Sequence, residues 1–399
     1  MRHCDILFTT MILAVLTAVS SCKSDDTDFG DVIPDPYFMP VKIAFDESPI
    51  EEMAEVIDGS DNDYVENGKF KHVVSVNYTA DGAEVTGASG VVDVETRGGH
   101  VTVRSASKSV EYRLTGSCDD GSFKVYSDNK FKLVLDNLKL HNPEGAVVNN
   151  QCGKSMYLVL TEASNNILST GSQVVIPSDE DMKGALFSEG QILISGKGRL
   201  YVESDFKNGI ATDDYLVVRP GNVIVVKSTA GNAVKANDGV YVRGSVLNLH
   251  TDFPGGKGIN CESDIVFSGG RTTVITEGDC FIEANDTTSS AAVKSDSTVC
   301  VTGGELNLLA RGSGGKGVNA NGGICIMGGK VTAVTLGDAH TASPNALKSD
   351  GEIALSGGSL YAYSRYAQVV RAGAVASFSY AEGYQSLEKK GGWFFSIGY

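Results

Sequence analysis

The chain has 399 residues, a formal net charge of -16 and an isoelectric point near 4.8. This acidity argues against a nucleic-acid partner, because phosphate binding needs a concentrated surface of Lys and Arg. The chain contains 47 Gly and one Trp, and its Val, Ile and Tyr residues lie between Gly-rich turns, which is typical of an all-β protein.

The first residues resemble a bacterial lipoprotein signal peptide. An apolar run from Ile6 to Leu16 is too short to span a bilayer, and small residues lead from it to Cys22. The resemblance implies removal of residues 1–21, lipidation of Cys22 and anchoring to the outer membrane. Ordinary secretion with a chance cysteine is the alternative. Residues Lys23 to Asp26 are similar to the acidic tag that sends some lipoproteins to the cell surface.

Residues 22–70 are acidic and irregular, which predicts a tether and a lead-in with one short helix near Glu51 to Ile57. From residue 71 to residue 377 the pattern changes to short strands separated by glycine. We expect irregular coils over residues 71–183 and regular coils over residues 184–365.

A short phrase recurs seven times within the regular part. Its copies begin at Ala185, Gly209, Ala233, Gly258, Ala292, Gly317 and Ala346, in steps of 24, 24, 25, 34, 25 and 29 residues. Counting the first residue as zero, positions +1, +7 and +9 are always apolar and position +3 is always small, as inward-facing strands and a tight corner require. The repeat predicts one elongated domain, a right-handed single-stranded parallel β-helix with about 24–25 residues per coil.

Two segments interrupt or end the repeat. The longest steps place insertions at residues 279–290 and 338–343, which are either functional loops or merely tolerated ones. Residues 378–399 are rich in aromatic side chains and predict a C-terminal cap, because the end of a solenoid otherwise exposes strand edges. A platform on which sugars stack is the alternative.

The cysteines give no metal motif. No CxxC pair and no histidine at ligand spacing supports a zinc site. Cys300 and Cys325 share one repeat position, so they should lie about one strand spacing, ~4.8 Å, apart. A disulfide between them is geometrically possible, but free thiols are favoured.

An acidic column marks position +4 of the repeat, and by alternation it faces outward. Its members are Glu189, Asp213, Asn237, Glu262, Asp296, Asn321 and Asp350. Carboxylates one strand spacing apart repel, and the first two coils have Phe187 and Ala211 where other coils carry Lys. Hard oxygen ligands favour calcium, so the candidate metal ligands are Glu189, Asp213, Asp214, Glu262, Asp296 and Asp350. A solvated acidic edge is the alternative.

Several phrases carry a family resemblance, namely those at Phe131 to Leu138, Asn208 to Val218 and Ala346 to Asp350. They are similar to the right-handed β-helix family of carbohydrate-binding domain proteins, over roughly residues 75–365. The resemblance implies binding of polygalacturonate-type acidic polysaccharide together with calcium, and no catalytic residues. The family phrase is Asp-Gly-Ile-Lys-Ser-Asp. This chain keeps the last acid, but it lacks the leading Asp in every regular copy.

Basic residues offer a second way to hold an acidic sugar. The candidate carbohydrate-binding residues are Lys235, Lys257, Lys294, Lys316 and Lys348, together with Arg219 and Arg243 at position +10. Their charges could meet uronate carboxylates directly where the family uses calcium. The alternative is that each Lys pairs with the acid of its own coil, an interaction of little individual strength.

Three functions remain open on this evidence. The first is a monomeric surface lipoprotein that binds acidic polysaccharide without cleaving it. The second is a polysaccharide lyase, for which Arg219 beside Asp213 and Asp214 is the one local candidate base. The third is an adhesive or structural rod that needs no small ligand.

Overall fold

The computed structural model describes residues 41–50, 60–88, 90–284, 286–374, 376–378 and 393–397. Over these residues the chain is all-β apart from two short 3-10 helices, η1 (Asp61–Asp63) and η2 (Val65–Asn67). None of the described helices has the length and apolar character needed to cross a membrane. The signal peptide, the lipidation site Cys22, the tag at Lys23 to Asp26 and the helix expected at Glu51 to Ile57 lie outside the described residues.

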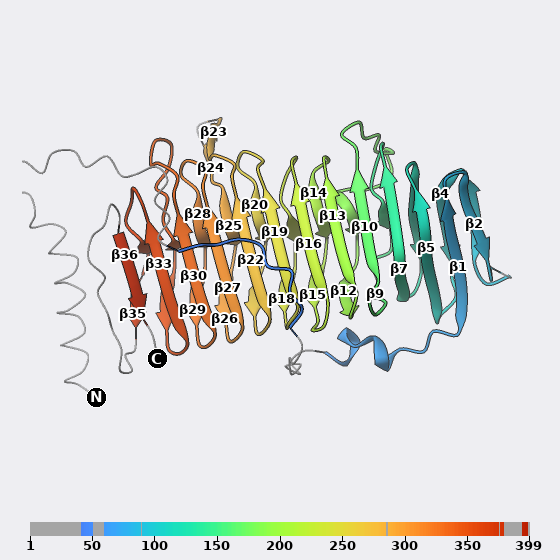
Figure 1. Ribbon diagram of the computed structural model, residues 1–399, viewed down its shortest axis with the longest axis horizontal. Coiled ribbons are helices and arrows are strands. Elements are labelled where there is room, and N and C mark those ends of the chain that lie inside the picture. Colours follow the sequence, from blue (N-terminus) through green and yellow to red (C-terminus); the bar gives the residue numbers. More distant parts are fainter. Residues whose placement is uncertain are drawn as a thin grey trace, which may run out of the picture. The chain divides into compact units, whose positions relative to one another are not determined.

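The predicted parallel β-helix is confirmed, and Figure 1 shows its strands stacked coil upon coil. Each regular coil adds one strand to each of three parallel ladders. Ladder 1 contains β4 (Gly99–Ser105), β6 (Gly121–Ser127), β8 (Val148–Asn150), β11 (Gly184–Ser188), β14 (Asn208–Thr212), β17 (Val234–Ala236), β20 (Lys257–Cys261), β25 (Ala291–Ser295), β28 (Lys316–Ala320), β31 (Leu347–Ser349) and β34 (Val370–Ala372).

Ladders 2 and 3 complete each coil. Ladder 2 contains β9 (Met156–Leu160), β12 (Ile192–Gly196), β15 (Tyr215–Val218), β18 (Gly239–Val242), β21 (Ile265–Phe267), β26 (Thr298–Val301), β29 (Gly323–Ile326), β32 (Glu352–Leu355) and β35 (Ala376–Phe378). Ladder 3 contains β10 (Asn165–Thr170), β13 (Arg199–Ser204), β16 (Val223–Ser228), β19 (Val246–Thr251), β22 (Arg271–Thr276), β27 (Glu305–Ala310), β30 (Lys330–Thr335) and β33 (Ser359–Ser364).

The first coils are irregular because ladders 2 and 3 start as one sheet. Strand β1 (His72–Thr79) pairs with β5 (Val110–Cys118), and β5 pairs with the long β7 (Phe131–Asn142). The first half of β7 then pairs with β9 and its last residues pair with β10. The two ladders therefore separate at β7, and the regular three-strand coil is established after it.

The core follows the repeat columns that the sequence predicted. The register pairs Leu186 with Ile210, Ile210 with Val234 and Val234 with Ile259, and the apolar columns are buried. Small residues at position +3 also contribute hydrogen bonds: the Ser188 hydroxyl donates to the carbonyl of Gly190 at 2.6 Å. Satisfying a buried corner carbonyl in this way requires a short polar side chain.

Antiparallel strands cover both ends of the solenoid. At the start, β2 (Gly82–Thr86) pairs with β1 and β3 (Asp93–Arg97) pairs with β4. At the other end, β36 (Trp393–Ile397) pairs with the last strand of ladder 3, β33. An exposed strand edge is a template for further pairing, and these strands occupy such edges. The predicted cap at residues 378–399 lies largely outside the described residues, with the β36 backbone described.

Residues 41–50 and 60–70, here called the strap, pack against the outside of the solenoid. Figure 1 shows the first of these segments running across the strands of ladder 3. The second segment places Val65 and Phe70 against an apolar patch of ladder 2, formed by Tyr157, Leu193 and Val217. The lead-in therefore has a packed structure where the sequence predicted only irregular chain.

Candidate functional site

The site of interest is the outward face of ladder 1 between β17 and β34. Its position +2 residues, in register from coil to coil, are Lys235, Asn260, Lys294, Asn319, Lys348 and Arg371. We call this row the cationic track. Because parallel strands lie ~4.8 Å apart, a positive charge recurs about every 10 Å from Lys235 to Lys348, with an asparagine amide between charges, and Arg371 follows Lys348 on the next coil. Arg371 was missed in the sequence because Val369 replaces the small residue that begins the other copies.

Three lysines of the track are held by acids of the neighbouring column. Lys294 pairs with Asp296 at 2.5 Å and Lys348 pairs with Asp350 at 3.0 Å, each within its own coil. Lys235 instead pairs with Glu262 of the next coil at 3.2 Å. The alternative that each Lys pairs with the acid of its own coil therefore holds for Lys294 and Lys348 but not for Lys235. Such pairs orient the ammonium groups but contribute little stability when they are solvated.

Three further cations lack a carboxylate partner within ion-pair distance in the described part of the chain: Lys257, Lys316 and Arg371. The Lys257 ammonium donates to the Gly255 carbonyl at 2.7 Å. The Lys316 ammonium donates to the Gly314 carbonyl at 3.2 Å. A carbonyl group carries no net charge, so these hydrogen bonds leave the positive charges of Lys257 and Lys316 without a counter-charge.

The environment of Lys316 reflects this excess. Burial lowers the pKa of its ammonium group to about 8, the nearby Cys280 thiol acts in the opposite direction, and the neighbouring charges of Lys348, Arg371 and Lys257 lower it further. Burial, together with the charge of Lys294, also lowers the pKa of Lys257. An anion placed on the track would relieve this repulsion.

One insertion lies beside the track. Residues 279–290 form an antiparallel hairpin of β23 (Phe281–Glu283) and β24 (Asp286–Thr288). The Asn319 amide donates to the Ser289 hydroxyl at 3.3 Å, so the end of this hairpin contacts the track directly. The position is compatible with a functional loop.

The predicted calcium ligands are held mostly by neighbouring side chains of this chain. Lys183 lies between Asp213 and Asp181 at 2.6 and 2.7 Å, so the expectation that no cation neutralises the first two regular coils is wrong. The sequence signal was overlooked because Lys183 stands just before the repeat begins. The pKa of Glu189 is raised, first by burial of its carboxyl group and then by the negative charge of Asp213.

The remaining candidate acids are also engaged. Asp214 accepts hydrogen bonds from the Gln191 amide and from the Tyr215 backbone, while Glu262, Asp296 and Asp350 pair with the track lysines. Among the described residues, no three side chains of His, Cys, Asp or Glu form a group that could hold a metal ion. Calcium binding stays a prediction, and the contacts of these carboxylates do not add support to it.

Arg219 and Arg243 have a structural position rather than the solvent-facing one expected for sugar contacts. Both are buried beneath the strap, where Arg243 pairs with Asp63 at 2.7 Å and Arg219 pairs with Glu66 at 2.8 Å. The Tyr64 ring lies 4.7 Å from the Arg219 guanidinium carbon. The prediction that these two arginines contact a ligand is corrected accordingly.

Cys300 and Cys325 lie opposite each other on β26 and β29, as their shared repeat position predicted. Both thiols are free in the structure. Burial, followed by a hydrogen bond with Cys325, raises the pKa of Cys300 to about 12. A thiol with so high a pKa is a poor nucleophile at neutral pH.

Comparisons with known proteins place these features in context. A family model described as "carbohydrate-binding domain-containing protein" matches residues 97–368. A curated protein of the same description from Acetivibrio thermocellus is 28% identical over 118 residues, which is 29% of this chain and 41% of that relative. A solved structure of the polysaccharide lyase-like protein from C. thermocellum, in a gadolinium derivative, has 15% identity and a TM-score of 0.41, covering 78% of this chain and 97% of that one.

Proposed function

The chain belongs to the family of carbohydrate-binding domain-containing proteins, and from this premise we propose that it binds an acidic polysaccharide, such as polygalacturonate, along the cationic track without cleaving it. The observation that most supports the acidic ligand is the group of three cations, Lys257, Lys316 and Arg371, without carboxylate partners among the described residues. All three lie on strands of ladder 1, with Lys316 only 6% exposed, in a chain whose formal net charge is -16.

The geometry of the track suits an extended chain of sugars. Its side chains form a straight row along the solenoid axis, so a polysaccharide lying along that axis meets one outward residue per coil. Lysine and arginine donate charge-assisted hydrogen bonds to carboxylates, and the half-buried amide of Asn260 can both donate to and accept from hydroxyls, whereas Asn319 is buried and bonded to Ser289. Asp296 and Asp350 hold their lysines in place, which reduces the side-chain entropy lost on binding.

Affinity electrophoresis tests this proposal. We expect the protein without its signal peptide to be retarded in a gel containing polygalacturonate and not in one containing a neutral polysaccharide. Because the contacts are electrostatic, retardation should weaken as salt is raised from low to physiological concentration. Equal mobility in the two gels would contradict binding of an acidic polysaccharide.

The same preparation tests the absence of cleavage. A lyase needs a base that reaches the substrate, and Arg219, the candidate from the sequence, is buried and bound to Glu66 under the strap. Incubation with polygalacturonate should therefore give no unsaturated products that absorb in the ultraviolet. A steady rise in that absorbance would establish a lyase.

The third candidate function is an adhesive or structural rod. In that case soluble polysaccharide would fail to compete with binding of the protein to whole cells.

We also propose that the protein acts as a monomeric lipoprotein of the outer membrane, exposed at the cell surface and anchored through Cys22. This rests on the apolar run and the small residues that precede Cys22. Mass spectrometry of the protein purified from membranes should show a mature chain that begins at a lipidated Cys22. An unmodified Cys22 in the secreted protein would support the ordinary secretion alternative.

A further inference from the structure

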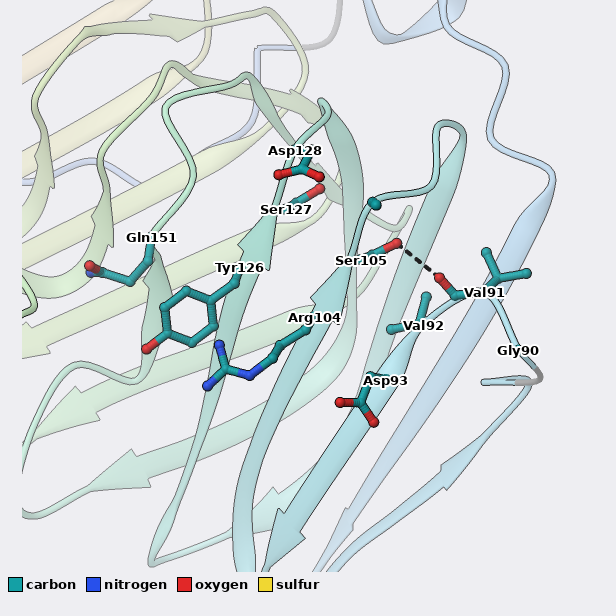
Figure 2. Close-up of a pocket in the computed structure, with 11 residues that line it drawn as sticks. Gly90, Val91, Val92, Asp93, Arg104, Ser105, Tyr126, Ser127, Asp128 and Gln151 are labelled. Carbon is teal, nitrogen blue, oxygen red and sulfur yellow. Dashed lines mark hydrogen bonds between the residues drawn. The ribbon is translucent and has the colours of Figure 1, made fainter.

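A cleft lies near the start of ladder 1, outside the cationic track. Its volume is about 820 Å³, within the range of small-molecule sites. Figure 2 shows Arg104 and Tyr126 at its centre, with Asp93 and Asp128 on its walls. Strand β3 pairs with β4 as an antiparallel edge strand and places Asp93 opposite Arg104.

The Tyr126 ring holds the central arginine of the cleft in place, and Glu180 and Lys124 outside the cleft hold Tyr126. The Arg104 guanidinium carbon lies 4.0 Å from the centre of the Tyr126 ring. The Tyr126 hydroxyl donates to the Glu180 carboxylate, and the Lys124 ammonium pairs with the same carboxylate at 2.6 Å. Burial, followed by this carboxylate, raises the pKa of Tyr126 to about 12, so the phenol keeps its donor proton at neutral pH. Arg104 therefore presents its hydrogen-bond donors from a fixed aromatic support.

The charged groups of the cleft have no ionic partners in the part of the chain that the structure describes. No carboxylate lies within ion-pair distance of Arg104, and no cation lies within that distance of Asp93 or Asp128. Arg104 and the two aspartates form a mixed set of donors and acceptors, while Gln151 and Ser127, which also line the cleft, already donate to Asn149, Asp181 and Asn129. A sugar hydroxyl both donates and accepts, so neighbouring hydroxyls of one sugar match a carboxylate beside a guanidinium.

The charges of the side chains that line the cleft favour a neutral sugar over an acidic one. Two carboxylates against one guanidinium would repel a uronate, which separates this cleft from the cationic track. Residues 180–183 lie between the two sites: Glu180 is bound to Lys124 and Tyr126, and Lys183 pairs with Asp213.

We propose that the cleft binds a neutral sugar residue, at the end or on a branch of a polysaccharide, with Arg104 and Asp93 as its main contacts. This deepens the proposed function, because the two sites would recognise different parts of one polysaccharide. The two proposals can fail separately. Binding in the cleft is tested with neutral sugars and Arg104 variants, and binding to the cationic track is tested with polygalacturonate and track variants.

Saturation-transfer NMR with the methyl glycosides of galactose, arabinose and rhamnose tests the proposal. We expect at least one of them to bind in the millimolar range. Arg104→Gln and Asp93→Asn should each weaken that binding about tenfold or more, since a hydrogen bond to a charged group is lost. The matched control is Arg97→Gln on β3, an exposed arginine paired with Glu95 outside the cleft, which should bind as the unmodified protein does.

Three results would overturn the proposal. The first is no saturation transfer from any of the three neutral glycosides. The second is binding that is unchanged in Arg104→Gln. The third is a methyl galacturonoside that binds better than the neutral glycosides and loses binding in Arg104→Gln, which would make the cleft an anion site. Retardation by polygalacturonate should stay intact in Arg104→Gln, and its loss would mean that the two sites are not separate.

Discussion

Replacing Asp63 by Leu should lower the free energy of unfolding by about 3–5 kcal/mol, the largest effect that we expect from any single substitution. Asp63 is 4% exposed and pairs with Arg243, which is 3% exposed. It also accepts a hydrogen bond from the Tyr215 hydroxyl at 2.8 Å. The substitution removes this carboxylate while the guanidinium remains buried, and a buried charge is costly without its counter-charge. Urea unfolding followed by circular dichroism measures the change.

Asp61→Leu is the matched control for this experiment. Asp61 lies in the same 3-10 helix, but its side chain is exposed, so its replacement should change the free energy of unfolding by less than about 0.5 kcal/mol. Limited proteolysis gives a second readout, because a released strap should be cut within residues 60–70 while the coils stay intact. Equal urea midpoints for the two variants would show that the strap does not depend on the buried pair.

Removing two charges from the cationic track should weaken polygalacturonate binding strongly. In the double variant Lys294→Gln, Lys348→Gln the ligand loses two charged donors, and Asp296 and Asp350 then face it without their partners. One charge-assisted hydrogen bond contributes about 1.5–3 kcal/mol, so we expect the dissociation constant to rise tenfold or more. Calorimetric titration with oligogalacturonate measures it.

The matched control removes two exposed lysines that lie off the track, as Lys139→Gln, Lys227→Gln. The net charge changes equally in both double variants, so long-range attraction is reduced alike and only local contacts differ. The control should bind within about twofold of the unmodified protein. A similar loss in both variants would mean that the polysaccharide senses overall charge rather than the track.

The same binding should depend on pH through Lys316. Its folded pKa of about 8 lies below the ordinary value of 10.5, so its charge is lost as the pH rises through about 8. Affinity for oligogalacturonate should therefore fall between about pH 7 and pH 9, and Lys316→Met should flatten that dependence. The stability of the free protein should change in the opposite sense and rise over this window, because the unfolded chain retains the proton longer.

The repeat made the core predictable, because each inward position must be apolar or small in every coil. The columns from Leu186 to Leu347 therefore reveal register, coil length and the direction of every strand. The strap was not predictable in this way. Its residues meet surfaces whose partners lie up to 225 residues away, as with Arg271 and Asp46, and they repeat no pattern of their own.

The candidate site was predictable in its residue types but not in its pairing. The spacing identified the rows of lysines and acids, yet it does not show which side chain is buried or which one reaches which, and Lys316 is buried. Lys235, whose own coil has Asn237 in the acidic column, reaches Glu262 of the next coil, and Lys183 reaches Asp213 from just before the repeat. Arg219 and Arg243 lie on positions that would face solvent in an isolated coil. A segment from elsewhere in the chain covers them instead.

The strap also determines how the molecule would resist mechanical force. In a bare solenoid, tension on one end peels coils away singly, since each coil contacts only its neighbours. Here a pull at residue 41 acts first on a segment that runs across ladder 3, where Asp46 pairs with Arg271 and Glu47 pairs with Arg199, three coils apart. Bonds to several coils are then loaded in shear and must break together. If the chain is held at its N-terminal side, as proposed above, the strap would keep the coils of ladder 1 folded under tension.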